Sequence, residues 1–144
     1  MIRRATLALA MLLTAGTRAH QPTRATDAEV TLAIFSGRVD PAWVLKPAEA
    51  AELRTRLMLL PRTYSTSTYP ANLGYLRVLL PAPGHSRRDV ITFDHGLVLW
   101  QSRKVILAFA DPDRKLEAWL LATGRGRTSE DKNWFEIKDM DRHP

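Results

Sequence analysis

Five residues between the first predicted strand and the first predicted helix form the strongest candidate for a binding site. Gly37 permits a positive φ, and Asp40 before a proline favours an extended backbone that leads into a turn. The guanidinium of Arg38 can hold a carboxylate or phosphate as a fork, and the indole of Trp43 can serve as a stacking surface. The candidate binding residues are Ser36, Gly37, Arg38, Asp40 and Trp43.

The same segment also has a structural interpretation, which its composition favours. Glycine, proline, serine and aspartate are the residues that an ordered connection between a strand and a helix requires. In this interpretation Trp43 fills part of the core. In the binding interpretation it is exposed.

Two histidines and two aspartates fall within eleven residues and supply enough ligand atoms for zinc or another transition metal. These residues are His85, Asp89, Asp94 and His95. Their spacing argues against a site, because His85 lies in a Pro/Gly loop and His95 at a hairpin tip. An extended strand between them separates the two imidazoles by roughly 20–30 Å. We therefore expect no metal and no cofactor.

No motif indicates a reaction. The chain contains no G-x-S-x-G elbow, no H-E-x-x-H and no glycine-rich phosphate loop. Ser65, Ser67 and the neighbouring threonines are candidates for hydrolytic chemistry, without an assigned base. Asp111 and Asp113 are better explained as residues at a helix start, where the helix dipole favours carboxylates.

Residues 1–19 have the pattern of a secretory signal peptide. Arg3 and Arg4 precede an apolar run of eleven residues, and Thr17-Arg18-Ala19 forms a cleavage site before His20. As a helix this run rises about 16 Å, against roughly 30 Å of membrane hydrocarbon. It is therefore predicted to be a signal that is removed near Ala19.

Removal of this signal changes what the charge implies. The full chain carries 21 basic and 15 acidic side chains, and loss of Arg3, Arg4 and Arg18 leaves 18 against 15, so the net charge falls from +6 to +3. The lower net charge weakens the case that the protein binds a nucleic acid. The chain has no cysteine, which excludes disulfides and thiolate sites. No second apolar run predicts a membrane span in the mature chain.

The remaining pattern alternates strands and helices. A helix is predicted at 47–60 from its apolar periodicity, and a second at 111–124, with Asp111 as N-cap, Trp119 against the sheet and Gly124 in a left-handed position after the last turn. A loop is expected at 62–74, and a last strand or arm at 134–137. It is undecided whether 97–109 forms one strand or two. Strands are predicted at 29–35, 75–80, 90–93, 97–100 and 105–109.

This order predicts an α+β fold with two layers. We expect a mostly antiparallel sheet of four or five strands with two helices on one face, in the order β-α-β-β-(β)-α. The predicted division is a signal peptide at 1–19, a flexible leader at 20–27 and a single domain at 28–140.

Two stretches resemble a motif of an uncharacterised family of small exported bacterial proteins. They are Ile34-Phe35-Ser36-Gly37-Arg38 with Asp40-Pro41-x-Trp43, and the Asp-x-x-x-x-Leu-Glu-x-Trp-Leu-Leu stretch at 111–121. The family pattern has Pro and Asn more often where this chain has Val39 and Asp40. The resemblance covers about a third of the mature chain and implies no activity.

Together these observations predict an exported, non-enzymatic binding or interaction domain, associated with the cell envelope, in the periplasm or outside the cell. The expected partner is an envelope or extracellular protein or an anionic ligand, and not a nucleic acid. Arg87-Arg88 and Arg125-x-Arg127 are the basic clusters that can meet such a partner. The alternative is a small extracytoplasmic hydrolase whose catalytic residues are unassigned.

Overall fold

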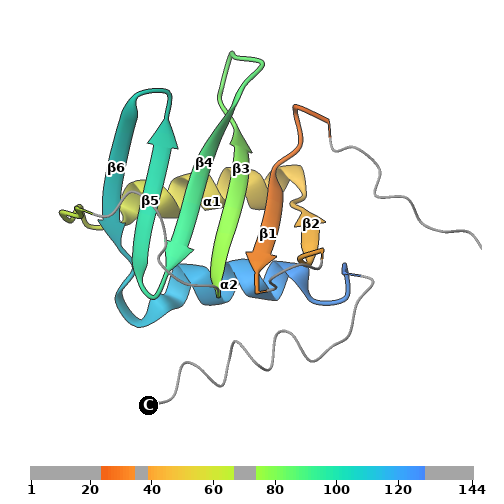
Figure 1. The fold of residues 1–144 in the computed structure, drawn as a ribbon. Coiled ribbons are helices and arrows are strands. Elements are labelled where there is room, and N and C mark those ends of the chain that lie inside the picture. Colours follow the sequence, from red (N-terminus) through yellow and green to blue (C-terminus); the bar gives the residue numbers. More distant parts are fainter. Residues whose placement is uncertain (1–23, 35–38, 67–73, 129–144) are drawn as a thin grey trace, which may run out of the picture.

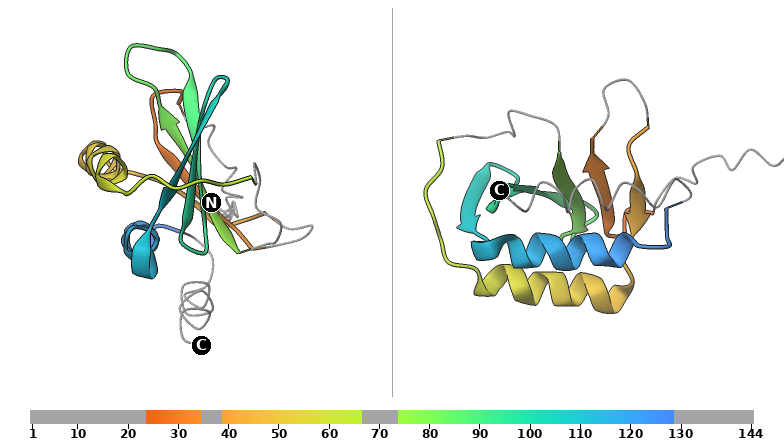
Figure 2. Two further views of the ribbon diagram at one scale, coloured as in Figure 1. Left: turned by 90° about the vertical axis from the view of Figure 1, so that its left-hand side faces the viewer. Right: turned by 90° about the horizontal axis from the view of Figure 1, so that it is seen from below.

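The computed structural model describes residues 24–34, 39–66 and 74–128, and within them six strands form one antiparallel sheet in the order β2-β1-β3-β4-β5-β6. Two α-helices of the same residues lie side by side on one face of this sheet (Figures 1 and 2). The elements are β1 (Glu29–Ala33), β2 (Ala42–Val44), α1 (Pro47–Leu59), β3 (Tyr75–Pro81), β4 (Arg88–Asp94), β5 (Leu97–Ser102), β6 (Val105–Ala110), the 3₁₀ turn η1 (Pro112–Arg114) and α2 (Lys115–Gly124). The predicted α+β class is confirmed.

The core lies between the sheet and the helices. Alternate residues of β3 and β4 are buried, as the period of a strand with one covered face requires. The apolar stripe of α1 packs against them through Ala50, Leu53 and Leu57. The opposite face of the sheet carries no described helix and is seen in Figure 1.

Two tight hairpins order the second half of the sheet. Asp94 pairs with Leu97 across a turn in which His95 (φ 49°) and Gly96 (φ 86°) are left-handed, the geometry that matches the twist of a hairpin. Ser102 pairs with Val105 across a second turn of two residues. Residues 97–109 therefore form two strands, which answers the question left open by the sequence.

The sixth strand, β2, was not predicted. Ala42–Val44 pairs antiparallel with β1, and the ladder is extended by hydrogen bonds from Leu32 N to the Pro41 carbonyl and from Leu45 N to the Ala28 carbonyl. Three residues are too few to show a period of two, and the preceding Pro41 indicated a turn. The sheet thus has six described strands, where four or five were expected.

The second helix begins later than predicted. Asp113 (φ 58°) and Arg114 (φ 53°), the last two residues of η1, are left-handed, so the regular α-helix begins only at Lys115. Asp111 nevertheless caps α2, because its carboxylate accepts hydrogen bonds from the N–H groups of Leu116 (3.1 Å) and Glu117 (2.9 Å). Asp111 thus supplies the capping carboxylate, but the N-cap position of α2 is Arg114, not Asp111 as predicted, and the helix begins at Lys115.

Two other expectations about this helix are wrong. Gly124 is not left-handed but is the last residue of α2, and Gly126 has the positive φ, 75°. Trp119 is only partly buried, and the guanidinium of Arg56 lies 4.9 Å from the centre of its ring. The buried tryptophan is Trp43, which is 4% exposed.

The predicted signal peptide at 1–19, most of the predicted leader and the predicted strand or arm at 134–137 lie outside the described residues. Within the described ranges, every helix is too short or too polar to cross a membrane.

Candidate functional site

Of the five candidate binding residues, the structure describes two. Asp40 accepts a hydrogen bond from Ile34 N at 3.0 Å and so closes the connection between β1 and β2. The Nε1–H of Trp43 donates to the Thr123 hydroxyl at 2.9 Å, and its ring is in the core. Trp43 is therefore where the structural interpretation places it. Ser36, Gly37 and Arg38 lie outside the described residues, so their role stays a prediction.

The four possible metal ligands do not come together. His85 lies in the β3–β4 connection and His95 in the β4–β5 turn, at opposite ends of β4. Asp89 is buried and accepts a hydrogen bond from the Nε1–H of Trp100 at 3.1 Å. In the described part of the chain, no three His, Asp or Glu side chains form a cluster that could hold a metal ion.

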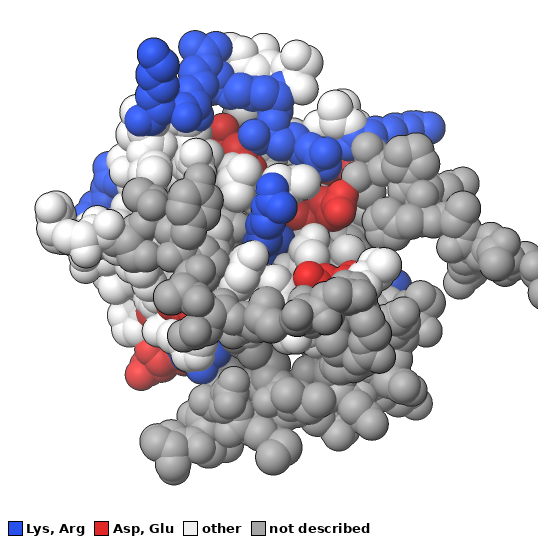
Figure 3. Space-filling model, viewed as in Figure 1, with Lys and Arg blue, Asp and Glu red and all other residues white. Residues whose placement is uncertain are grey.

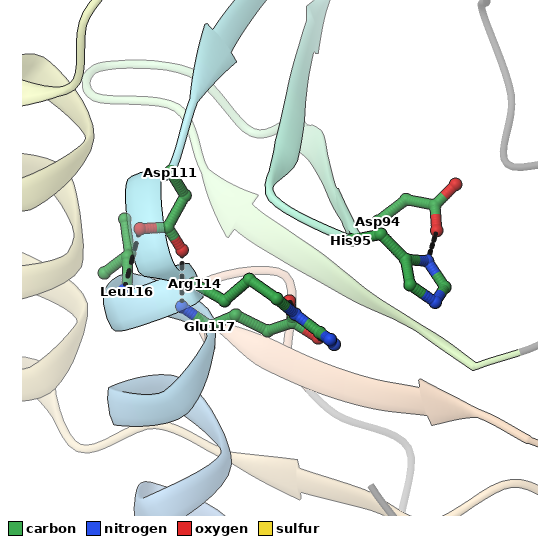
Figure 4. A network of polar contacts seen from close by, with 6 residues as sticks. All are labelled: Asp94, His95, Asp111, Arg114, Leu116 and Glu117. Atoms are coloured by element: carbon green, nitrogen blue, oxygen red, sulfur yellow. Dashed lines mark hydrogen bonds and ion pairs between the residues drawn. The ribbon is translucent and has the colours of Figure 1, made fainter. Parts of the chain in front are cut away.

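Among the described residues, Asp94 and His95 form a pair that resembles part of a catalytic triad. Asp94 Oδ1 lies 2.5 Å from Nδ1 of His95, an arrangement that orients an imidazole (Figure 4). Asp94 is also the only described hydrogen-bond partner of His95. A hydrolase needs a nucleophile beside the imidazole, and among the described residues none stands there.

A buried network lies at the start of α2 (Figure 4). Glu117 is fully buried, and its carboxylate accepts two hydrogen bonds from the Arg114 guanidinium at 2.9 and 3.0 Å. Arg114 has a left-handed backbone, and its side chain reaches this carboxylate. Asp111 caps the same helix with its own carboxylate. Burial of a charge is tolerated only with such a partner. We interpret the network as structural.

The strongest candidate for a binding surface is a group of cations at one end of the open sheet face, which we call the basic end. In Figure 3, Lys and Arg side chains line the upper part of that face. Arg88 begins β4, and Arg103 and Lys104 form the β5–β6 turn. The residues of the basic end are Arg77, Arg88, Arg103 and Lys104, while Arg87 turns toward the buried Asp89 on the other face.

The register of the strands explains this gathering. Val90 pairs with Gln101, so the same register carried two residues further places Arg88 beside Arg103. Arg77 pairs with Thr92 and therefore lies on the same face as Arg88, four residues or about 13 Å along the strand. Three separate stretches of the chain thus contribute charge to one surface.

Carboxylates neutralise this surface only in part. Glu29 lies 3.7 Å from Arg88, and on the other face Asp89 lies 3.8 Å from Arg87, both longer than a hydrogen bond. Buried nitrogens of both arginines have no hydrogen-bond partner. Arg77, Arg103 and Lys104 are exposed, and no described carboxylate forms an ion pair with them. The surface therefore keeps an excess of positive charge.

Part of this site was predicted from the sequence. The prediction singled out Arg87-Arg88 as a basic cluster but missed Arg77, Arg103 and Lys104, which are distant along the chain. Once the strand register is known, their position on one face of the sheet identifies them. The second basic cluster is different, because Arg127 pairs with Glu49 at 2.6 Å.

Comparison with known proteins adds no relative to this description. No protein-family model matches the chain, and no curated protein or solved structure matches it.

Proposed function

We propose that this chain is an exported binding domain that captures an anionic polymer of the cell envelope on its basic end. The observation that carries the proposal is the excess of cations on one open sheet face. Four basic residues meet there, and the nearby carboxylate of Glu29 lies beyond hydrogen-bond distance of Arg88. Such a surface attracts anions and orients them through guanidinium hydrogen bonds.

The spacing favours a polymer over a small anion. Arg88 and Arg103 lie side by side, while Arg77 is about 13 Å away along the strands. One phosphate or carboxylate cannot contact both positions, but repeated anionic groups along a chain can. Leu79 and Val90 lie on the same face between them and are partly exposed, so an extended ligand can contact the sheet there.

Export is part of the same proposal. Its support is the order of a basic stretch, an apolar run and a cleavage site in residues 1–19. The intact mass of protein recovered from the periplasm or medium tests it. A chain that starts near His20 supports export, and soluble exported protein that retains residues 1–19 contradicts it.

Binding is tested with heparin as the polyanion. The test variant combines Arg77→Gln and Arg103→Gln. The control variant combines Lys46→Gln and Lys115→Gln and so removes the same charge from exposed positions elsewhere. The first should weaken binding about tenfold, equivalent to about 1.4 kcal/mol, and elute from a heparin column at lower salt. The control should stay within about twofold of the wild type.

An equal loss in both variants would show a response to net charge alone and would contradict the proposal. Unfolding midpoints of all three proteins must agree for the comparison to count. A small extracytoplasmic hydrolase remains the alternative prediction, and the described residues assign it no nucleophile.

A further inference from the structure

The outer edge of β6 is only half covered. Ala110 N donates to the Pro61 carbonyl at 2.9 Å, and Thr63 N donates to the Ala108 carbonyl at 3.0 Å. Residues 61–63 therefore lie along β6 like a short additional strand, with a bridge between Arg62 and Phe109. The described hydrogen bonds of this cover end at Ala108, and none of them reaches residues 105–107.

The backbone of Ile106 points outward at the uncovered part. In an antiparallel ladder, alternate residues turn both N–H and C=O toward the same neighbour. Ala108 and Ala110 bond outward to residues 61–63. By alternation, the N–H and C=O of Ile106 also point outward, while those of Val105 and Leu107 point toward β5. No described group bonds to the outward N–H and C=O of Ile106.

The side chains at this edge are apolar, and its two ends are basic. Val105 is 55% exposed and Ile106 is 41% exposed. Arg103 and Lys104 stand at one end, and at the other the guanidinium of Arg62 lies 4.9 Å from the centre of the Phe109 ring. An exposed, β-branched edge with free backbone groups is a template for strand addition. Its flanking cations select a partner with acidic ends.

We propose that this edge binds an extended, acid-flanked segment of a partner protein, which adds to the sheet beside β6. The central residue of the segment exchanges two backbone hydrogen bonds with Ile106. Its acidic residues face Arg103 and Lys104 at one end and Arg62 at the other. This inference goes beyond the proposed polymer site, because it rests on the outward backbone groups of β6, although Arg103 and Lys104 belong to both sites.

A second copy of the chain fits this edge poorly. Two β6 edges paired about Ile106 can form a ladder only over 105–107, because residues 61–63 of each copy cover the next positions. The same pairing brings Lys104 of one copy toward Arg62 of the other. Like charges that face each other across a strand pair are destabilising.

The test uses a synthetic seven-residue peptide with valine, threonine and valine at its centre and two glutamates at each end. Binding is followed by NMR titration of the backbone amides of the full protein. We expect the largest shift at the Ile106 amide, together with slower hydrogen exchange there. Methylation of the central peptide nitrogen removes one donor and should weaken binding about fivefold to tenfold. Replacement of the four glutamates by lysines should weaken it at least as much.

A protein variant gives an independent check. Ile106→Pro removes the outward N–H, a change that an edge strand tolerates, and should weaken peptide binding at least as much as methylation of the peptide does. Ile106→Thr keeps the backbone donor and should retain binding. Because the peptide changes cannot unfold the protein, they decide the question even if the proline variant is unstable.

Equal binding of the methylated and unmethylated peptides would overturn the inference, as would shifts centred away from β6. Concentration-dependent protection of Ile106 without peptide would identify a second copy as the occupant and would also overturn it. Heparin binding should be unchanged in Ile106→Pro, so the two proposals can fail separately.

Discussion

Gly124 lies so close to the indole of Trp43 that no side chain fits between them. A Cβ at this position would lie 2.7–2.9 Å from three atoms of the ring, Cε2, Cδ2 and Cζ2. Trp43 also donates a hydrogen bond to Thr123. The last turn of α2 is therefore joined to β2, an edge strand of only three residues.

Gly124→Ala should destabilise the protein by about 1–3 kcal/mol, because the added methyl group overpacks the contact with Trp43. In an exposed helix the same change would stabilise by up to about 1 kcal/mol, so the sign itself is informative. Denaturant unfolding measures it. Trp43→Phe in the same chain should relieve part of the penalty, and a Gly124→Ala protein as stable as the wild type would contradict the contact.

The two tryptophans should differ in their importance for stability. Trp43→Ala should cost about 3–5 kcal/mol as a core truncation. Trp119→Ala should cost about 2 kcal/mol, since a half-buried indole removes about half as much apolar area from water. Chemical denaturation of both variants compares them, and a greater loss at Trp119 would restore the original expectation that this residue is buried against the sheet.

Asp111→Ala should cost about 1–3 kcal/mol, because it leaves the buried N–H groups of Leu116 and Glu117 without an acceptor. Asp111→Asn keeps one acceptor oxygen and should retain part of this stability. Asp113→Asn is the control, because it removes the exposed carboxylate that contacts the exposed Lys115 but keeps a residue type that tolerates the left-handed backbone at this position. Its stability should change by less than about 0.5 kcal/mol. Thermal melts of the three variants check the order.

Glu49 should make stability depend on pH in the acid range. Two hydrogen bonds from Arg127 lower the pKa of Glu49 below its usual 4.5, against the effect of burial, and one from Lys46 N lowers it further. A carboxyl whose pKa is lower in the folded state stabilises the fold above pH 4.5, and this contribution is lost as pH falls through the folded pKa. Stability should therefore decrease below about pH 4.5.

Unfolding measured from pH 7 to pH 3 tests this. Glu49→Gln should lose about 0.5–1 kcal/mol at pH 7 and show a flatter profile in acid. Glu52→Gln is the matched control, because it removes a carboxylate from the same helix. The partner of Glu52 is Arg56, one turn away on α1, and not a residue after the end of α2. Parallel profiles for Glu49→Gln and the wild type would refute the assignment.

By itself the sequence determined the elements whose pattern is local. Alternation along β3 and β4, the three- and four-residue steps of α1, and the Asp94-His95-Gly96 turn each follow from the geometry of neighbouring residues. These were sufficient for the α+β class and for placing both helices on one face of the sheet. They also identified Asp111 as the source of the capping carboxylate, because capping depends on a side chain within a few residues of the helix.

Tertiary structure decided what depends on distant partners. The buried face of α2 includes Glu117 and Gly124 but not Trp119, because Arg114 neutralises Glu117 inside the core and Gly124 makes room for Trp43. β2 exists as a strand because β1 pairs with it, and three residues cannot show that alone. The basic end and the uncovered edge at Ile106 arise from strand register, since cross-strand pairing brings Arg77, Arg88 and Arg103 to one face and leaves one side of β6 without a partner.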